Sequence, residues 1–283
     1  MKKIIEKYIT NMPSLPTTVT KVMEICEDRT SAPADLNRII SMDPVLMGRV
    51  MQLINSAFYG RPNKITSLVR AIILLGLNTV KNLALSTAVL GSLPENRADG
   101  ALNMEGFWEH SLCTAVIAKK IASATDVDPK LQDEYFIAGL LHDIGKIPLS
   151  EALAPEYLAV ISKADIEHSN LVEAEDRLLG FEHQQIGALI ADHWKIEGAI
   201  RDSILHHHDS GDYDGEFKKL VYTIAVSDYA SLYLERGFAG NRYPKEPPQR
   251  IYEELGIGFS DIEAFSSDIR TEIDKARVFL SLS

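Results

Sequence analysis

The sequence predicts an all-α protein. Hydrophobic residues recur at helical spacing through most of the chain, and short segments containing Pro, Gly or Asn separate these stretches. No stretch in the first third alternates between apolar and polar residues as a half-buried β-strand would. The simplest arrangement is two helical lobes packed around apolar cores.

The first third contains a series of predicted helices. Asp43 followed by Pro44 is typical of a helix start, with Asp as the N-cap and Pro in the first turn, and Asp35 can serve the first turn of its own helix. The predicted helices here are Ile4–Thr10, Thr17–Glu27, Ala34–Ser41, Val45–Ser56 and Ser67–Leu90.

A polar segment with Pro and Gly, Ser92–Gly100, predicts a boundary near residue 97. We therefore expect an N-terminal lobe over 1–97, a helical core over 98–240 and a C-terminal extension over 241–283, in which 243–248 is a loop. The helices predicted after the boundary are Phe107–Ala124, Leu131–Gly145, Pro155–Lys163, Asn170–Leu179, His183–Lys195, Glu197–His206, Leu220–Glu235 and one or two within Ser260–Leu280.

Composition and charge narrow the classes of function. The 283 residues are 46% hydrophobic and 24% charged, as in folded soluble proteins, and no window approaches the roughly 18 apolar residues that span a membrane. We expect a cytoplasmic protein that makes no membrane contact. The net charge of −11 and the lack of a basic face argue against duplex DNA or RNA as a partner. Acidity is compatible with a metal-dependent phosphoesterase, where cations offset repulsion.

Ionisable residues interrupt helices that are otherwise apolar on nearly every side. His142 and Asp143 stand in the middle of one such predicted helix, and Asp228 in another. His110 shares a helix face with apolar residues, so it too should face the core. A buried charge is costly unless it is paired or binds a metal.

Further histidines extend this set into a candidate metal site. His183 stands at a predicted helix start, and His206, His207 and His208 precede Asp209 at a helix end. Nitrogen and oxygen ligands without sulfur suit one or two divalent ions of iron, manganese, nickel, zinc or magnesium. His168 and His193 are interpreted as hydrogen-bonded structural residues and are left out of the site.

The spacing of the central residues assigns them roles. Neighbouring helical residues diverge by about 100°, so His142 and Asp143 can reach one metal only if it lies between them. Asp143 can also bridge two ions. Lys146, one turn later, would project a cation toward the same cavity and hold a phosphate oxygen. Asp143 and Lys146 are therefore the candidate catalytic residues.

In their order and context these residues resemble the HD superfamily of metal-dependent phosphohydrolases. Its signature is an isolated His, then a His-Asp pair, then a distant Asp, which here are His110, His142, Asp143 and Asp228. The additional ligands of the HD-GYP branch, which hydrolyses cyclic dinucleotides, are similar to His183, His207 and His208. The resemblance leaves open whether His206 or His208 accompanies His207.

The N-terminal lobe resembles a different branch, the HDOD family of bacterial signalling proteins. The resemblance rests on Leu15-Pro16, Asp43-Pro44, Asn55-Ser56-Ala57, Leu75-Gly76 and Trp108-Glu109-His110-Ser111. Together the two resemblances cover about residues 13 to 235. They imply an HD-type helical core with an added N-terminal helical lobe. Two positions depart from HD-GYP enzymes: the segment Asp209–Glu216 lacks the Gly-Tyr-Pro loop, and Gly106 stands where some carry a Glu for a third metal.

Two functional hypotheses follow. In the first, the metal site binds and hydrolyses a phosphate-containing small molecule or nucleotide. In the second, the site is structural or sensory, and the N-terminal lobe binds a signalling protein. A third hypothesis, that the N-terminal helices read DNA, conflicts with the acidic charge and the absence of a basic recognition helix. The sequence leaves the substrate, the metal, the upstream signal and the oligomeric state open.

Overall fold

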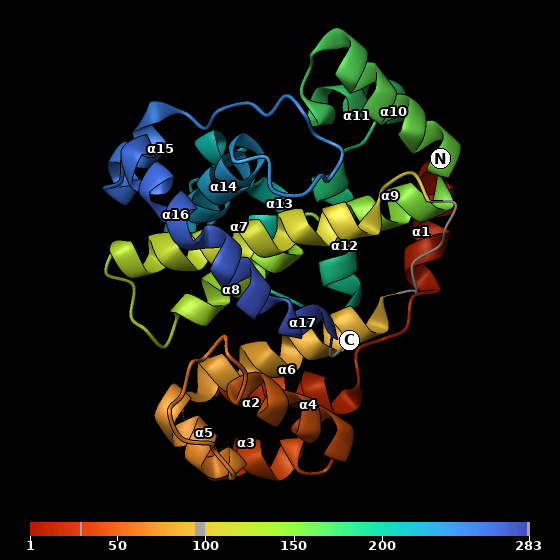
Figure 1. Cartoon of the computed structure of the whole chain (residues 1–283). Helices are drawn as coiled ribbons and strands as arrows, with labels where there is room; N and C mark the ends of the chain where they lie inside the picture. The colour runs from red at the N-terminus through yellow and green to blue at the C-terminus, as the bar shows by residue number, and fades with distance from the viewer. Residues whose placement is uncertain (29, 94–99, 282–283) are drawn as a thin grey trace.

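The fold is entirely helical over the residues that the computed structural model describes, which are 1–28, 30–93 and 100–281. Helices α2 to α5 form one end of the molecule, and α6 lies between them and the rest (Figure 1). The helices of this first part are α1 (Lys2–Thr10), α2 (Thr17–Glu27), α3 (Pro33–Ile40), α4 (Pro44–Ile54), α5 (Leu68–Leu75) and α6 (Leu77–Ser92).

The second part is built around α7 (Met104–Ala124), which crosses the middle of the molecule in Figure 1 and packs against α8, α14 and α16. The remaining elements are α8 (Gln132–Leu141), α9 (Lys146–Ala152), α10 (Ala154–Glu167), α11 (Leu171–Leu179), α12 (His183–His193), α13 (Gly198–His206), the short 3-10 helix η1 (Ser210–Asp212), α14 (Lys218–Tyr233), α15 (Gln249–Leu255), α16 (Phe259–Ala276) and α17 (Val278–Ser281).

Local sequence signals explain several helix starts. Asp43 accepts a hydrogen bond from the backbone N–H of Leu46 at 2.9 Å, as its position before Pro44 predicts. Asp35 accepts from the N–H of Ala32 at 3.0 Å at the start of α3. Such caps satisfy N–H groups that have no partner within the helix.

The single helix predicted over Ser67–Leu90 is wrong, because it divides into α5 and α6 at Gly76. Gly76 has φ +93°, a conformation that favours glycine, and the two helices bend by 116° at this point. Among the described residues, no single helix is long and apolar enough to cross a membrane, and α5 with α6 meets those criteria only as this bent pair.

The helix predicted over Leu131–Gly145 ends earlier than expected. Helix α8 stops at Leu141, so His142 and Asp143 lie in a turn before α9 rather than in the middle of a helix. Gly145 explains the break: a Cβ there would collide with the backbone carbonyl of His183, so the turn packs directly on the start of α12. Helices α9 and α15 were not predicted.

The termini link the two parts of the molecule. Helix α1 packs against α9 and α12, and the indole of Trp194 donates to the carbonyl of Pro13 at 2.9 Å. At the other end, the ring of Phe279 in α17 lies 5.1 Å from that of Phe58 and 4.8 Å from that of Phe136. The boundary predicted near residue 97 lies outside the described residues.

Candidate metal centre

Seven predicted ligands converge from five segments of the second part. His110 comes from α7, the His142-Asp143 pair from the turn after α8, and His183 from the first residue of α12. Six of the seven are at most 5% exposed, and the His208 side chain is 14% exposed. The remaining three are His207 and His208, which directly follow α13, and Asp228 in α14.

The first group of ligand atoms surrounds one oxygen of Asp143. The Nε2 atom of His110 lies 3.1 Å from Oδ1 of Asp228 and 3.3 Å from Nε2 of His142. The Oδ2 atom of Asp143 is 3.5 Å from Nε2 of His110 and 3.4 Å from Nε2 of His142. These four side chains therefore present two nitrogens and two oxygens to one small volume.

The second group surrounds the other oxygen of the same carboxylate. The Oδ1 atom of Asp143 lies 3.2 Å from Nε2 of His183 and 3.6 Å from Nε2 of His207. His183 Nε2 is 3.3 Å from His207 Nε2 and 3.2 Å from His208 Nε2. The ligand atoms of this group all lie within 4.8 Å of one another. Asp143 is thus shared between two adjacent sets of ligands.

The residues fit divalent metal ions. Oδ1 of Asp143 is buried and accepts no hydrogen bond within the described part of the chain, which is costly for a carboxylate oxygen. Five imidazole Nε2 atoms face one another or carboxylate oxygens. In neutral rings these atoms cannot all find hydrogen-bond donors, whereas bound cations would pair with all of them. The ligand set of nitrogen and oxygen without sulfur marks a divalent metal site.

Outer partners hold the imidazole rings with Nε2 facing inward. Nδ1 of His142 donates to the carbonyl of Gly139 at 2.7 Å, and Nδ1 of His207 donates to that of Ile204 at 2.9 Å. Nδ1 of His110 lies 3.0 Å from the hydroxyl of Ser231. A partner at Nδ1 sets the tautomer and ring orientation that a metal-binding Nε2 requires.

Glu175 is a functional residue that the sequence pattern did not identify. This buried side chain accepts hydrogen bonds from Nδ1 of His183 at 2.7 Å, from the backbone N–H of His183 at 2.9 Å and from the hydroxyl of Tyr157 at 2.8 Å. Its signal in the sequence is a Glu on an apolar helix face, four residues after Leu171 and four before Leu179. Glu175 therefore supports the second group through His183.

Lys146 pairs with the shared carboxylate. Its Nζ lies 2.7 Å from Oδ2 of Asp143, and the whole residue is 2% exposed. A buried lysine of this kind neutralises the carboxylate that both ligand groups share. It does not line the pocket above the site, so its predicted contact with a phosphate oxygen needs a ligand that enters the buried floor.

The histidines of the site differ in their pKa values. Burial disfavours the charged form of His142, yet Asp143 and Asp228 raise its pKa to about 10. Burial lowers the pKa of His207, and burial with the neighbouring His207 holds the pKa of His208 well below its usual value. Hence His207 and His208 are neutral and ready to ligate, whereas His142 must lose a proton first.

The carboxylates of the site remain ionised. Burial would raise the pKa of Asp143, but His142 and Lys146 hold it well below its usual range. Burial likewise acts against ionised Asp228, and its hydrogen bonds with His110 and His142 again lower the pKa overall. Both side chains are therefore charged ligands at neutral pH.

Close helix packing brings the ligands together. A Cβ on Gly139 would lie 2.7 Å from the Cα of Ala115, so α8 can approach α7 this closely only with glycine there. That approach places His142 beside His110, whose ring centroids are 5.2 Å apart.

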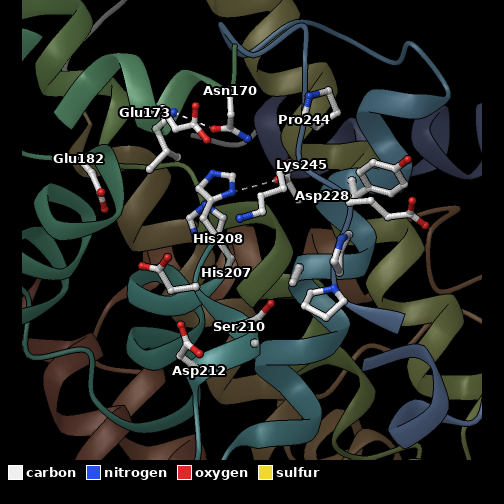
Figure 2. Close-up of a pocket in the computed structure, with 18 of the residues that line it drawn as sticks. Asn170, Glu173, Glu182, His207, His208, Ser210, Asp212, Asp228, Pro244 and Lys245 are labelled. Carbon is white, nitrogen blue, oxygen red and sulfur yellow. Dashed lines mark hydrogen bonds and ion pairs between the residues drawn. The ribbon is translucent and has the colours of Figure 1, made fainter. Parts of the chain in front are cut away.

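A pocket of about 380 Å³ opens onto the site, with His207, His208 and Asp228 in its wall. Figure 2 shows His207 and His208 among the lining residues, with Pro244 and Lys245 of the segment 241–248 on one side of them. The segment that replaces a Gly-Tyr-Pro loop also lines it, through Asp209 and Asp212.

Three other histidines lie outside the cluster. The ring of His206 packs against Tyr213, with centroids 4.9 Å apart, so the structure brings His207 and His208 into the site and leaves His206 out. His193 contacts the carbonyl of Met12 at 3.2 Å, and His168 ends α10 and packs against Tyr243.

Most of the chain matches a known protein family. The model of the HDOD domain family matches residues 12–210. An uncharacterized protein of Treponema pallidum (strain Nichols) is 26% identical over 231 residues, which are 80% of this chain and 43% of that protein. The chain thus spans less than half the length of this curated relative.

Two solved structures share the fold. An HDOD domain protein of unknown function from Geobacter sulfurreducens has a TM-score of 0.75 and 27% identity, covering 98% of this chain and 96% of its own. A protein from Shewanella amazonensis SB2B, named as a candidate phosphohydrolase, has a TM-score of 0.71 and 22% identity, with 98% of each chain covered.

Proposed function

The chain belongs to the HDOD family, and we propose that its buried centre holds two divalent ions and hydrolyses a phosphate ester as part of a signalling process. The observation that carries the proposal is the position of Asp143, whose two oxygens face two separate groups of histidines. Asp143 would help to hold both ions, and these would supply Lewis acidity to a phosphoryl oxygen and increase the acidity of water.

The side chains of the protein would prepare the site for that chemistry. Ser231 and Glu175 orient His110 and His183, so that little reorganisation is needed when ligands bind. Lys146 keeps Asp143 ionised and placed between the two groups. In this role Lys146 would also bring a positive charge to within reach of a phosphoryl oxygen that enters the floor of the site.

The proposal has support from outside the site. The fold is shared with the Shewanella amazonensis protein that is named as a candidate phosphohydrolase. The likeness to that structure concerns the fold, so the activity of this chain rests on its own ligand set. The two groups of ligand atoms in this chain support catalysis, because a pair of ions can stabilise both the attacking and the leaving oxygen of a phosphate ester.

Phosphate release by metal-loaded protein tests the proposal. Protein loaded separately with Mn²⁺, Fe²⁺ and Zn²⁺ is assayed against phosphomonoesters, phosphodiesters, nucleotides and cyclic dinucleotides. We expect turnover of at least one class, lost in His142→Ala and Asp228→Asn. His206→Ala is the matched control, since His206 neighbours the ligands but lies outside the cluster. Metal-loaded protein that cleaves none of these classes contradicts the proposal.

A second function, a non-catalytic signalling module, is favoured by one specific contact. Helix α8, which ends next to His142, packs against α6, and its Phe136 ring lies 4.8 Å from that of Phe58. Through this contact, metal binding beside α8 would change the packing of the first part of the molecule, where a signalling protein would bind. This function predicts that His142→Ala reduces thermal stability and partner binding without the loss of any turnover.

A further inference from the structure

The pocket above the metal centre is negatively charged on one side. Two carboxylates come from the exposed face of α11, one from the residue before His183, and two from the segment around η1. None forms an ion pair with a lysine or arginine of the described residues. We call this set the acidic wall: Glu173, Asp176, Glu182, Asp209 and Asp212.

The opposite side of the pocket has fewer charges. The segment 241–248 contributes Lys245 and Glu246, and the first turn of α15 contributes Arg250. Neither Lys245 nor Arg250 has an ion-pair partner in the part of the chain that the structure describes. In Figure 2, Glu173 and Glu182 lie on one side of the His207–His208 pair, and Pro244 and Lys245 lie on the other.

The charge therefore differs between the metal floor and the walls of the pocket. At the floor, two divalent ions would bring more positive charge than Asp143 and Asp228 neutralise, so an anion is attracted there. In the walls around the floor, the five carboxylates of the acidic wall and Glu246 outnumber the two cations, Lys245 and Arg250. Charges within a few ångströms of one another in a partly enclosed pocket interact more strongly than they do in water.

From this pattern we infer that the site selects ligands with a single phosphoryl group whose remaining part is neutral or positively charged. The phosphoryl group would bind at the metal floor beside Lys245, and the remainder would lie against the acidic wall. A second phosphate or a carboxylate on the ligand would face Glu173, Asp176 and Asp209 and be repelled. The inference rests on the proposed function, because it assumes that the phosphoryl group binds at the metal ions.

The size of the pocket agrees with such a ligand. A volume of about 380 Å³ is at the small end of the range for sites that bind small molecules. Because Pro244, Pro247 and Pro248 are also in its wall, this side of the pocket has restricted backbone freedom. The site is thus suited to a small ester rather than to an extended polyanion.

Three ligands of similar size isolate the charge of the remainder. Phosphoethanolamine, ethyl phosphate and phosphoglycolate each carry one phosphoryl group, with a positive, neutral and negative remainder respectively. Their dissociation constants are measured by calorimetry on the metal-loaded chain of 283 residues at low ionic strength. We expect phosphoethanolamine to bind at least tenfold more tightly than phosphoglycolate, with ethyl phosphate between them. The spread should narrow in 0.5 M salt, as screening increases.

Removal of two carboxylates of the acidic wall should reduce the differences among the three dissociation constants. The double variant Glu173→Gln with Asp176→Asn should bring the three dissociation constants to within about threefold, mainly by improving phosphoglycolate binding. The matched control, Glu24→Gln with Glu263→Gln, removes the same charge from exposed positions on α2 and α16 and should leave the spread unchanged. If the control variant reduces the differences among the dissociation constants equally, these differences reflect net charge alone, and the inference is overturned.

The remaining outcomes separate this inference from the proposed function. If all three ligands bind with equal affinity, or if phosphoglycolate binds most tightly, the inference is wrong while phosphate binding at the metal centre stands. If none of the three binds the metal-loaded chain, the inference is wrong, and the proposed function is then decided by the phosphate-release assay on diesters and nucleotides.

Discussion

The Oε2 atom of Glu175 lies 2.7 Å from Nδ1 of His183, and the two side chains are both fully buried. This carboxylate does not reach the metal site itself. It determines which nitrogen of His183 carries the proton and holds the ring so that Nε2 faces Oδ1 of Asp143. The second ligand group therefore depends on Glu175, which contacts the ligand His183 and not the metal position itself.

Glu175→Gln should weaken metal binding at the second group by roughly 10- to 100-fold, because the uncharged amide is a poorer acceptor for His183. Isothermal calorimetry with Mn²⁺ measures the effect on each site. Glu24→Gln, an exposed change on α2, is the control. Equal weakening of both sites would mean that Glu175 stabilises the fold as a whole rather than His183.

Metal binding should release protons at pH 7.5. His142 has a pKa of about 10 in the metal-free protein, so it is protonated at that pH and must deprotonate to ligate. The affinity for the first ion should therefore rise as pH increases toward 10, by up to about tenfold per pH unit for each proton released. Calorimetry in buffers of different ionisation enthalpy counts these protons. Binding without proton release would contradict the assigned charge of His142.

Substitution of single ligands should separate the two groups. His207→Ala removes a ligand of the second group only and should reduce the metal content from two ions to one. Asp143→Asn removes the shared carboxylate and should reduce the affinity for both ions. Metal content is measured by mass spectrometry of dialysed protein, with His206→Ala as the control. Full retention of metal by Asp143→Asn would show that this carboxylate is not shared.

Lys245→Met should reduce the affinity of metal-loaded protein for ethyl phosphate by roughly threefold, since one exposed positive charge near the anion is lost. Lys64→Met removes an exposed lysine far from this pocket and is the control. Binding of ethyl phosphate is compared by calorimetry. An unchanged affinity in Lys245→Met would place the anion away from the segment 241–248.

Phe279→Ala should lower the free energy of unfolding by about 3 kcal/mol, because the ring is 2% exposed and contacts Phe58 and Phe136. Chemical denaturation measures this change. Ile166→Ala, at a position 79% exposed, should change stability by no more than about 0.5 kcal/mol. Similar values for the two variants would mean that α17 does not contribute to the core.

The helical fold class and several of the ligand residues could be predicted from the sequence. Buried ionisable residues on apolar helices are costly, so the sequence pattern alone singles out His110 and Asp228. The all-helical class follows from the helical spacing of the hydrophobic residues. These residues pack together where α7 contacts its neighbouring helices. The family resemblance links residues that are far apart in the chain, which periodicity alone cannot do.

Other features depend on tertiary packing. The break at Gly76 depends on its left-handed backbone conformation, with φ +93°, and the turn at Gly145 depends on the close approach of the His183 backbone. Periodicity continues across both points, so the pattern predicts unbroken helices. The pairing of Lys146 with Asp143 inside the protein likewise depends on burial, which spacing along a helix does not determine.

The most direct test of the shared carboxylate is a crystal structure of Mn²⁺-loaded protein with anomalous scattering data. Two anomalous peaks about 3.5–4 Å apart are expected. One should be ligated by Asp143 with His110, His142 and Asp228, and the other by Asp143 with His183, His207 and His208. A single peak, or two peaks of which only one contacts Asp143, would contradict it.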